Sequence, residues 1–459
     1  MIKIGVLTFS PGVSHDPYIE SSLQELIKWL KNASNLEVTY NNEIIGTIQK
    51  ALQETKRLIS QDVDCLLFFI PDWTFPNLIV EAAGVREAPV LLFSPLDPSH
   101  AGLIGMLASS AALDQLGMKN TRIWGKIGDD ETLEKIISHA KVVYTLNELN
   151  GRVLGLFGGS PMGIYTATAD PSQVYSVFGV DVKHIDQLEI VRRAEKVSKD
   201  KIDKAYEWLK QKVKKIYFDG NKLTEEILRK QISSYLATKE IIKEEQLDFI
   251  AVKCHPELSG GFCSQCLTQA FMNDPYDWDG DKKIVPTACE SDIDGAITME
   301  ILHLLTGEPV TFFDLRHFSQ VDNIFTFMNC GAQSTWFASR SSNPSEDLEL
   351  VSLCPQIFDA GGASLQFQCS PGEITLARLS RIKREYAMQI ALAEFIERPA
   401  EEMKKTVFGW PQGFIKLKSD PTEFLATIGS NHMHAVYGNW VDELVEISNY
   451  LDIELKICI

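Results

Sequence analysis

Two carboxylates, Glu290 and Asp314, are the residues whose types and spacing most directly suggest chemistry. Ile284–Cys289 is a short apolar run that predicts a strand ending at Glu290. Val310–Phe313 predicts a second strand, which ends at Asp314. The residues between the two runs have helical periodicity, with a stop at Gly307. Because a right-handed crossover joins parallel strands, we expect these two strands to be parallel neighbours.

This arrangement would bring the two acids to one edge of a sheet. Neighbouring strands lie about 4.8 Å apart, and open α/β sheets bind ligands at the carboxyl ends of their strands. Two carboxylates that close repel each other unless they share a proton or a cation. The pattern therefore predicts a site for a hard divalent metal, and the alternative is two solvated acids at the starts of loops.

A histidine-containing stretch, Asn431–His434, is the second chemical feature, although it lies far from the acids in sequence. Histidine is the commonest side-chain ligand of transition metals, and two carboxylates with one histidine form a facial set that leaves positions for substrate oxygens. His432 and His434 alternate, so an extended segment would point both to one side. One of them would then be a ligand and the other would bind substrate or support the site. A buried structural histidine is the competing interpretation.

Other residues suggest weaker candidates for a site. Cys254, His255, Cys263 and Cys266 offer four soft ligands, but their spacing matches no common zinc pattern, and buried thiols are the favoured interpretation. Several tryptophans stand in loop-like contexts, where an aromatic ring can bind the apolar face of a sugar or simply pack. The candidates are Trp73, Trp336, Trp410 and Trp440.

Composition limits the class of protein. The chain has 459 residues, of which 45% are hydrophobic and 23% charged, as in a soluble globular protein. Its formal net charge of −18 should repel both nucleic acid and an anionic membrane, so neither is expected as a partner. The N-terminus lacks the pattern of a signal peptide, no run of 18 apolar residues occurs, and nine scattered cysteines do not form a disulfide framework. We expect a cytoplasmic protein.

The order of expected elements divides the chain into three. Strands near 2–9, 36–40, 65–70 and 90–93 alternate with helices and predict a doubly wound α/β domain over residues 1–148. Asp16 and Pro17 would open its first helix as N-cap and first residue. A second α/β domain, residues 149–320, carries the acids. Short β-like runs in residues 321–459 predict a mainly antiparallel, barrel-like C-terminal domain carrying the histidine; Tyr386–Glu397 is ambiguous between strand and helix.

Three separated motifs resemble the L-fucose isomerase family, which is related more distantly to L-arabinose isomerase. They are ACESDIDGAITMEILHLLTGEPVTFFDLRH, VKCHPEL with the later NDPYDWDG, and NHMHAVYGN. The first domain departs from that family, because Ser10–His15 follows the first strand where an arginine-containing sugar-contact turn is expected. The chain is also shorter than typical fucose isomerases, so a diverged member with another sugar remains open.

The resemblance implies two N-terminal α/β domains, a C-terminal β-barrel domain, and assembly into trimers or hexamers. It implies a Mn²⁺-type ion, or another divalent cation such as Co²⁺ or Mg²⁺, held by Glu290, Asp314 and His432. The expected function is aldose–ketose isomerisation of an L-fucose- or D-arabinose-like monosaccharide, in which Glu290 and Asp314 move a proton between C1 and C2. Substrate contacts are expected from His434, Trp336, Trp410 and Asn431, and supporting contacts from Lys253, Glu257 and Arg316.

Two other classes of function fit the same sequence. A non-catalytic sugar-binding or regulatory protein would bind sugar without exchanging its C1 or C2 proton. A metal-dependent aldolase or hydrolase would use the same acids to break a bond.

Overall fold

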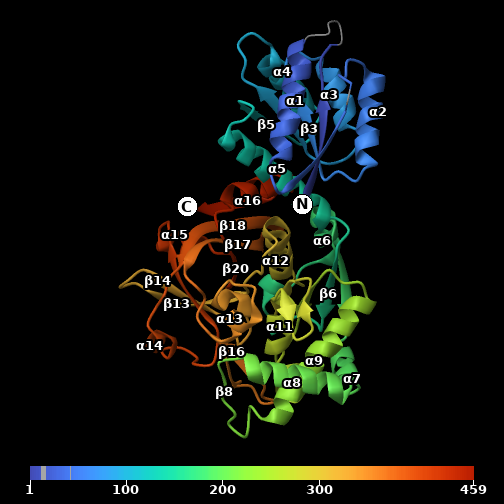
Figure 1. Cartoon of the computed structure of the whole chain (residues 1–459). Coiled ribbons are helices and arrows are strands. Elements are labelled where there is room, and N and C mark those ends of the chain that lie inside the picture. Colours follow the sequence, from blue (N-terminus) through green and yellow to red (C-terminus); the bar gives the residue numbers. More distant parts are fainter. Residues whose placement is uncertain (12–16, 42) are drawn as a thin grey trace. The chain divides into compact units, whose positions relative to one another are not determined.

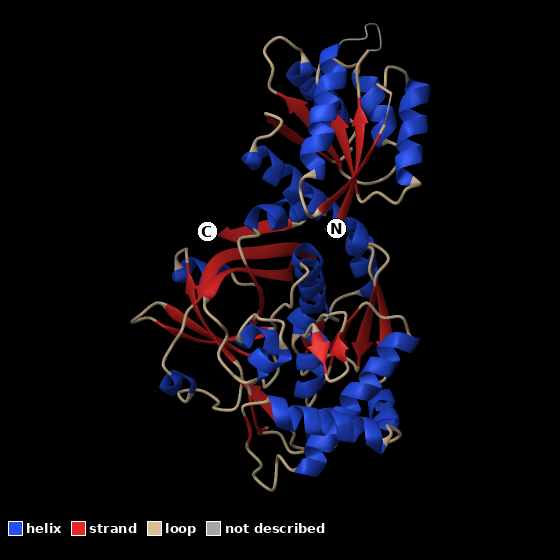
Figure 2. Cartoon of the chain, viewed as in Figure 1, coloured by secondary structure: helices blue, strands red, loops and turns tan. Residues whose placement is uncertain are grey.

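The computed structural model describes residues 1–11, 17–41 and 43–459, and it separates into two compact units, Met1–Glu148 and Leu149–Ile459. Asp16, which was predicted to cap the first helix, and most of the Ser10–His15 turn lie outside the described residues. Figure 1 labels the elements, and Figure 2 distinguishes helices from strands.

The first unit is a five-stranded parallel sheet with the strand order β2-β1-β3-β4-β5. Its strands are β1 (Ile2–Thr8), β2 (Leu36–Tyr40), β3 (Cys65–Phe69), β4 (Val90–Pro95) and β5 (Asn120–Gly125). Helices lie on both faces of the sheet (Figure 1). They are α1 (Pro17–Lys31), α2 (Ile48–Ile59), α3 (Pro76–Ala83), α4 (Gly102–Gln115) and α5 (Asp130–Leu149). Because both faces are covered, strands such as β3 are apolar throughout, as the doubly wound prediction requires.

The second unit begins with a four-stranded parallel sheet in the order β12-β9-β6-β7. Its strands are β6 (Val153–Phe157), β7 (Asp181–Ile185), β9 (Phe249–Val252) and β12 (Thr287–Cys289). The helices of this region are α6 (Pro171–Phe178), α7 (Leu188–Ala194), α8 (Lys199–Lys212), α9 (Glu225–Glu244), α10 (Glu257–Gly261), α11 (Cys266–Asn273) and α12 (Ile293–Thr306).

An antiparallel barrel forms the other half of the second unit. Six strands pair in a ring, β17-β20-β13-β14-β19-β18, which closes because β17 also pairs with β18. These strands are β13 (Phe313–Ser319), β14 (Ile324–Met328), β17 (Gly372–Ile382), β18 (Glu385–Phe395), β19 (Gln412–Leu417) and β20 (His432–Tyr437). A seventh strand, β21 (Glu454–Cys458), adds to β18 in parallel. The mixed fold class predicted from the sequence is therefore confirmed.

Smaller elements complete the second unit. A separate three-stranded sheet has the order β16-β15-β8, and β10 and β11 form a two-stranded hairpin. The strands are β8 (Lys215–Ile216), β10 (Tyr276–Asp277), β11 (Gly280–Asp281), β15 (Ser352–Pro355) and β16 (Ala363–Gln366). The remaining helices are α13 (Pro344–Leu348), α14 (Ala400–Met403), α15 (Pro421–Thr427) and α16 (Val441–Tyr450).

Helix α12 connects the parallel sheet to the barrel and positions the candidate site. It packs against β12 and β9 on one side and against β17 and β20 on the other. Every residue from Ile293 to Leu302 is buried, so the helix is covered nearly all round, as expected of a helix enclosed between two layers.

The predicted pairing of the two acid-bearing strands is wrong. β12 pairs with β9 in the parallel sheet, whereas β13 pairs with β14 and β20 in the antiparallel barrel. Asp314 lies within β13, rather than after a strand that ends at Phe313. Val310–Phe312 leads from α12 into the barrel, so the segment between the acids crosses between two sheets instead of returning to one.

Candidate metal centre

The side chains of Glu290 and Asp314 nevertheless lie close together, and both lie close to His432. The Nε2 atom of His432 lies 3.2 Å from Oε2 of Glu290 and 3.6 Å from Oδ1 of Asp314. One potential ligand atom from each of the three side chains falls within 4.8 Å of the others. The barrel supplies two of them as direct cross-strand partners, because Asp314 on β13 is paired with His432 on β20.

Glu290 reaches this point through an unusual backbone turn after β12. Its φ is 58°, and that of Ser291 is 51°, so two consecutive non-glycine residues occupy the left-handed region. The Ser291 hydroxyl donates to the carbonyl of Phe157 at the end of β6 at 3.2 Å. Such backbone conformations are costly and cluster at functional sites, where surrounding structure holds them. Here the turn directs Glu290 from the edge of the parallel sheet towards the barrel.

Asp292 fixes the orientation of His432 and was not singled out by the sequence analysis. One of its carboxylate oxygens, Oδ2, lies 2.6 Å from Nδ1 of His432 and 2.5 Å from the Arg378 guanidinium. All three side chains are fully buried. Because an ionised carboxylate only accepts hydrogen bonds, Nδ1 carries the proton, and the lone pair of a neutral ring lies on Nε2, towards Glu290 and Asp314.

The charges around the site follow from this arrangement. Burial disfavours the charged form of Asp292, but the Arg378 guanidinium and the His432 hydrogen bond outweigh it and lower the pKa of this carboxyl. Burial likewise opposes a charge on His432, yet the hydrogen bond to Asp292 and the nearby carboxylate of Glu290 raise the pKa of the imidazole to about 10. The pKa of Asp314 is raised by burial and by the charge of Glu290, although His432 opposes this shift.

The donor set fits a divalent cation. Among the residues the structure describes, neither Oε2 of Glu290 nor Nε2 of His432 has a hydrogen-bond partner, although both atoms are buried. Unsatisfied buried polar atoms are costly, and a cation between them would satisfy both. Two carboxylates and one imidazole suit Mn²⁺ and similar ions that favour oxygen ligands but tolerate nitrogen.

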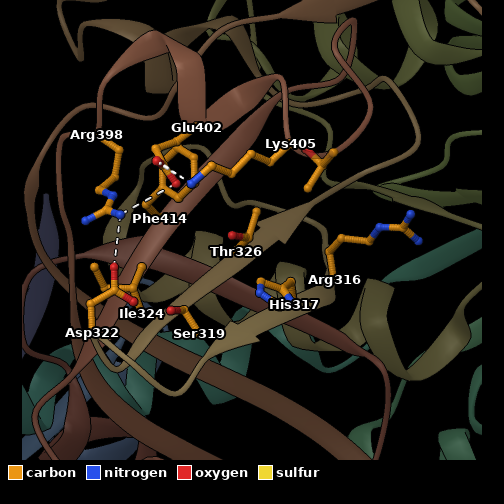
Figure 3. A pocket seen from close by; sticks show the side chains of 11 residues that line it. Arg316, His317, Ser319, Asp322, Ile324, Thr326, Arg398, Glu402, Lys405 and Phe414 are labelled. Carbon is orange, nitrogen blue, oxygen red and sulfur yellow. Dashed lines mark hydrogen bonds and ion pairs between the residues drawn. The ribbon is translucent and has the colours of Figure 1, made fainter.

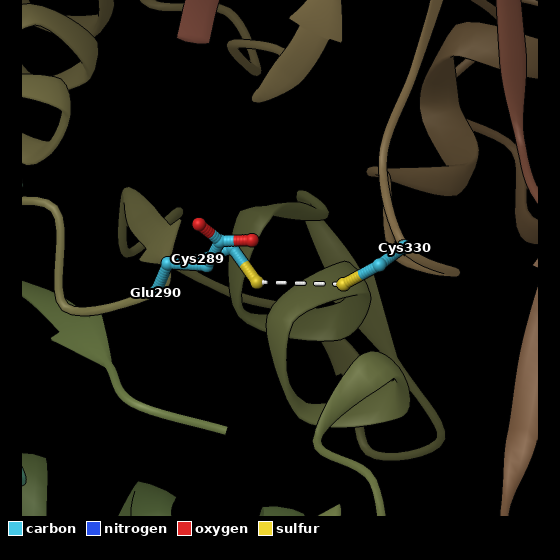
Figure 4. Close-up of side chains that lie close together, drawn as sticks. All are labelled: Cys289, Glu290 and Cys330. Atoms are coloured by element: carbon cyan, nitrogen blue, oxygen red, sulfur yellow. Dashed lines mark hydrogen bonds between the residues drawn. The ribbon is translucent and has the colours of Figure 1, made fainter. Parts of the chain in front are cut away.

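A second group of potential ligands, Cys289, Glu290 and Cys330, lies beside the first (Figure 4). The two sulfur atoms are 3.8 Å apart. The hydrogen bond with Cys289 and burial raise the pKa of the Cys330 thiol well above its ordinary value. A protonated thiol is a poor ligand for a hard cation, so this pair borders the site without competing for such an ion.

The alternative zinc site is not formed. Within the described part of the chain, Cys254, His255, Cys263 and Cys266 do not gather as a ligand group. Burial raises the pKa of Cys263 to about 12 and that of Cys266 to about 11. The three cysteines are buried thiols, the interpretation favoured by the sequence.

Two of the expected substrate contacts lie beside the candidate ligands. The Asn431 amide donates to Oδ1 of Asp314 at 2.9 Å. Trp410 is half-buried, and its indole N–H donates to Gln356, whose own amide donates to the Cys330 carbonyl at 2.6 Å. Asn431 therefore contacts a candidate ligand directly, whereas Trp410 reaches the backbone of Cys330, at the border of the site, through Gln356.

The positions of Trp336 and His434 argue against direct contact with a substrate. Trp336 is 5% exposed and packs against Phe337 and Tyr437 in the core. His434 has no exposed surface; its Nδ1 lies 3.0 Å from the Thr311 carbonyl and its Nε2 lies 3.4 Å from Arg378. Burial lowers the pKa of His434 to about 3, so this ring is neutral and packs behind the site.

The structure gives the three expected supporting residues other contacts than the candidate ligands. Lys253 and Glu257 form an ion pair with each other at 2.7 Å. Arg316 lines a separate cavity of about 410 Å³ on β13, β14 and the segment around α14 (Figure 3). Arg398 in this cavity is paired with Asp322 at 2.9 Å, and none of the three candidate metal ligands lines it.

Comparison with known proteins agrees with this architecture. Three family models match the chain: the first N-terminal domain of L-fucose isomerase at residues 17–151, the second at 154–246 and the C-terminal domain at 327–458. Matches to all three domains of one sugar isomerase place the chain among the aldose–ketose sugar isomerases. The chain belongs to the L-fucose isomerase family, as the motifs predicted.

Individual relatives carry two different names. A sulfoquinovose isomerase of Priestia aryabhattai is 22% identical over 99% of this chain and 98% of its own length. An L-fucose isomerase of Haemophilus influenzae is 22% identical over 91% of this chain and 84% of its own. A solved periplasmic solute-binding protein of Actinobacillus succinogenes with bound D-allose aligns with 67% of this chain and 93% of its own chain at 10% identity, with a TM-score of 0.18. No described helix has the length and hydropathy needed to cross a membrane.

Proposed function

We propose that the protein is a metal-dependent isomerase that moves a proton between C1 and C2 of a monosaccharide through an enediol. The observation that carries this proposal is the convergence of Glu290, Asp314 and His432 on one point. We propose Mn²⁺ as the cation, with Co²⁺ or Mg²⁺ as substitutes. When bound, such a cation polarises the sugar carbonyl and stabilises the negative charge that develops on the neighbouring oxygens.

Glu290 and Asp314 would transfer the proton. An isomerase needs one group that takes a proton from one carbon and returns it to the next, and a second that assists transfer at oxygen. Burial and the charge of Glu290 raise the pKa of Asp314, which favours a role for this carboxyl in proton transfer. The Asn431 amide holds the Asp314 carboxylate from one side, and Asn431 and Trp410 would contact the sugar.

We propose an L-fucose- or D-arabinose-like aldose as the substrate, converted by a cytoplasmic homo-trimer or homo-hexamer. Because relatives are named for both L-fucose and sulfoquinovose, a substrate panel should include a neutral and a sulfonated sugar. Size-exclusion chromatography with light scattering measures the oligomer.

Proton NMR of candidate aldoses in heavy water with Mn²⁺ tests the function. We expect the matching ketose to appear together with solvent deuterium at C1 or C2. Sugar binding without exchange would favour the non-catalytic alternative, and products of bond cleavage would favour an aldolase or hydrolase. Glu290→Gln should abolish ketose formation, whereas Glu225→Gln, in an exposed ion pair with Arg229 on α9, should not. Undiminished turnover by Glu290→Gln would refute the role given to this residue.

A further inference from the structure

A basic cavity in the second unit stands out against the acidity of the whole chain. It has a volume of about 810 Å³ and is lined by residues of α7, α8 and α9 and by Trp278 and Asp279 of the β10–β11 hairpin. Seven of its thirteen lining residues are lysine or arginine and only two are acidic. The chain as a whole has a formal net charge of −18.

Four of the seven cations already have acidic partners. Arg192 and Arg193 pair with Glu189 and Glu244 at 2.8 and 2.6 Å. Lys204 pairs with Asp279, and Lys239 with the buried Asp277, at 2.7 and 2.6 Å. These pairs hold the walls of the cavity in place.

The other three cations, Lys196, Lys201 and Lys243, have no ion pair among the described residues. They come from three different parts of the fold: the turn after α7, the first turn of α8 and the end of α9. A solvated helix face would spread its charges over a convex surface. Here three lysines without an ion pair instead line one concave space, which also includes Glu240 and is of the size that holds a small ligand.

We propose that this cavity binds a small anion with two or more phosphate groups. Two phosphate groups carry more negative charge and more acceptor oxygens than one, so they can better meet three ammonium groups that come from different parts of the fold. A long nucleic acid fits less well, because beyond the cavity it would meet an acidic surface, whereas charges more than about 8 Å away are screened from a compact ligand at physiological salt. None of the lining residues belongs to the candidate metal centre, so the site is additional to the isomerase centre.

Isothermal titration calorimetry of the full-length protein with pyrophosphate, at low ionic strength, tests this site. We expect pyrophosphate to bind at least about tenfold more tightly than orthophosphate, with an affinity that falls as salt is added. The triple variant Lys196→Glu, Lys201→Glu and Lys243→Glu should weaken pyrophosphate binding by at least about tenfold, because it places three negative charges in the cavity.

The control is a triple variant with the same change in net charge at exposed lysines outside the cavity: Lys214→Glu, Lys404→Glu and Lys416→Glu. It should bind pyrophosphate within about twofold of the wild type, since distant charges are screened. Equal weakening of pyrophosphate binding in both variants would overturn the proposal. Wild-type affinity in the cavity variant would also overturn it, because the pyrophosphate would then bind elsewhere, such as at the metal of the isomerase centre. Tighter binding of a single-stranded oligonucleotide than of pyrophosphate would also overturn it. Circular dichroism verifies that both variants remain folded.

Discussion

Asp292 shows how one buried residue controls the chemistry of another. Asp292 lies within hydrogen-bond distance of His432 and forms an ion pair with Arg378. Neither of these two contacts involves Glu290 or Asp314. Carboxylates behind a metal-binding histidine fix the tautomer and the direction of the ring. The proposed activity therefore depends on a side chain that is not expected to touch the cation or the sugar.

Asp292→Asn should weaken Mn²⁺ binding by about 10- to 100-fold, because the amide no longer fixes His432 with Nε2 free for the metal. It should also reduce the free energy of unfolding by about 3–5 kcal/mol, since the Arg378 charge stays buried without its counter-ion. Calorimetric Mn²⁺ titration and chemical denaturation measure the two effects.

Asp294→Asn is the matched control for this variant. Asp294 is also fully buried in the same turn and pairs with Arg381 at 2.9 Å, but it makes no contact with His432. We expect the control to lose stability while its Mn²⁺ affinity is retained. If the two variants lost affinity equally, the special role of Asp292 would be contradicted.

Metal affinity should rise with pH. In the metal-free protein the pKa of His432 is raised to about 10, so the ring is protonated at neutral pH and a cation must displace that proton. Displacement of one proton predicts about tenfold tighter binding for each pH unit between pH 6 and 8. Mn²⁺ titrations at several pH values measure this slope, and an affinity independent of pH over this range would contradict the assignment of His432.

At the scale of elements, the start of α12 is the junction on which the site depends. Asp292 caps the helix by accepting a hydrogen bond from the backbone N–H of Gly295 at 2.9 Å while its other oxygen holds His432 and Arg378. A Cβ atom at Gly295 would lie 2.6 Å from Oδ2 of Asp292 and 2.7 Å from the Arg378 guanidinium. The glycine is therefore required by the close approach of the ion pair to the helix.

Gly295→Ala should destabilise the protein and weaken Mn²⁺ binding, although alanine is a better helix former than glycine by about 1 kcal/mol. The methyl group would displace the Asp292–Arg378 pair and with it His432. Gly260→Ala in α10 is the control, because no heavy atom lies within 4 Å of its added Cβ. Thermal unfolding should show a lower midpoint for the first variant only; a stabilised Gly295→Ala would sink the argument.

Much of the order of helices and strands was predictable because it follows from local patterns of apolar residues. The strands of the first unit follow from apolar runs such as that of β3, which are independent of distant partners. Tyr386–Glu397 was ambiguous because its apolar residues fit both periods, and pairing with β17 along the whole of β18 makes it a strand. The partner of β13 could not be predicted, because no local signal distinguishes a strand that rejoins its sheet from one that enters a barrel.

The difference between local patterns and distant partners also explains what could be predicted of the site. Glu290, Asp314 and His432 were predictable from residue type and motif, whereas Asp292 resembled an ordinary helix cap. Its second role depends on Arg378 and His432, which are 86 and 140 residues away. Trp336 was misplaced for a related reason, because a loop-like sequence context gives no measure of burial.

At the scale of the whole molecule, the thiols should be inert in the folded protein. The structure has no disulfide among its nine cysteines, all of which lie in the described residues, and eight of them are buried, with Cys330 partly exposed. Burial raises the pKa of thiols such as Cys369 and Cys354, which disfavours the reactive thiolate. A thiol reagent such as DTNB should therefore react slowly with the native protein and release nine equivalents in denaturant. If most of the thiols reacted rapidly with DTNB in the native protein, the buried, reduced arrangement would be contradicted.

The whole chain combines a net negative charge with a local basic cavity and a candidate metal centre, and the central claim concerns the metal centre. That claim is that Glu290, Asp314 and His432 hold one divalent cation. The most direct measurement is an Mn²⁺ titration followed by electron paramagnetic resonance, with the variants Glu290→Gln, Asp314→Asn and His432→Gln and the control Glu225→Gln. We predict a single tight Mn²⁺ per wild-type chain, at least about tenfold weaker binding in each of the three variants, and no change in the control. Wild-type affinity retained in all three variants would contradict the account.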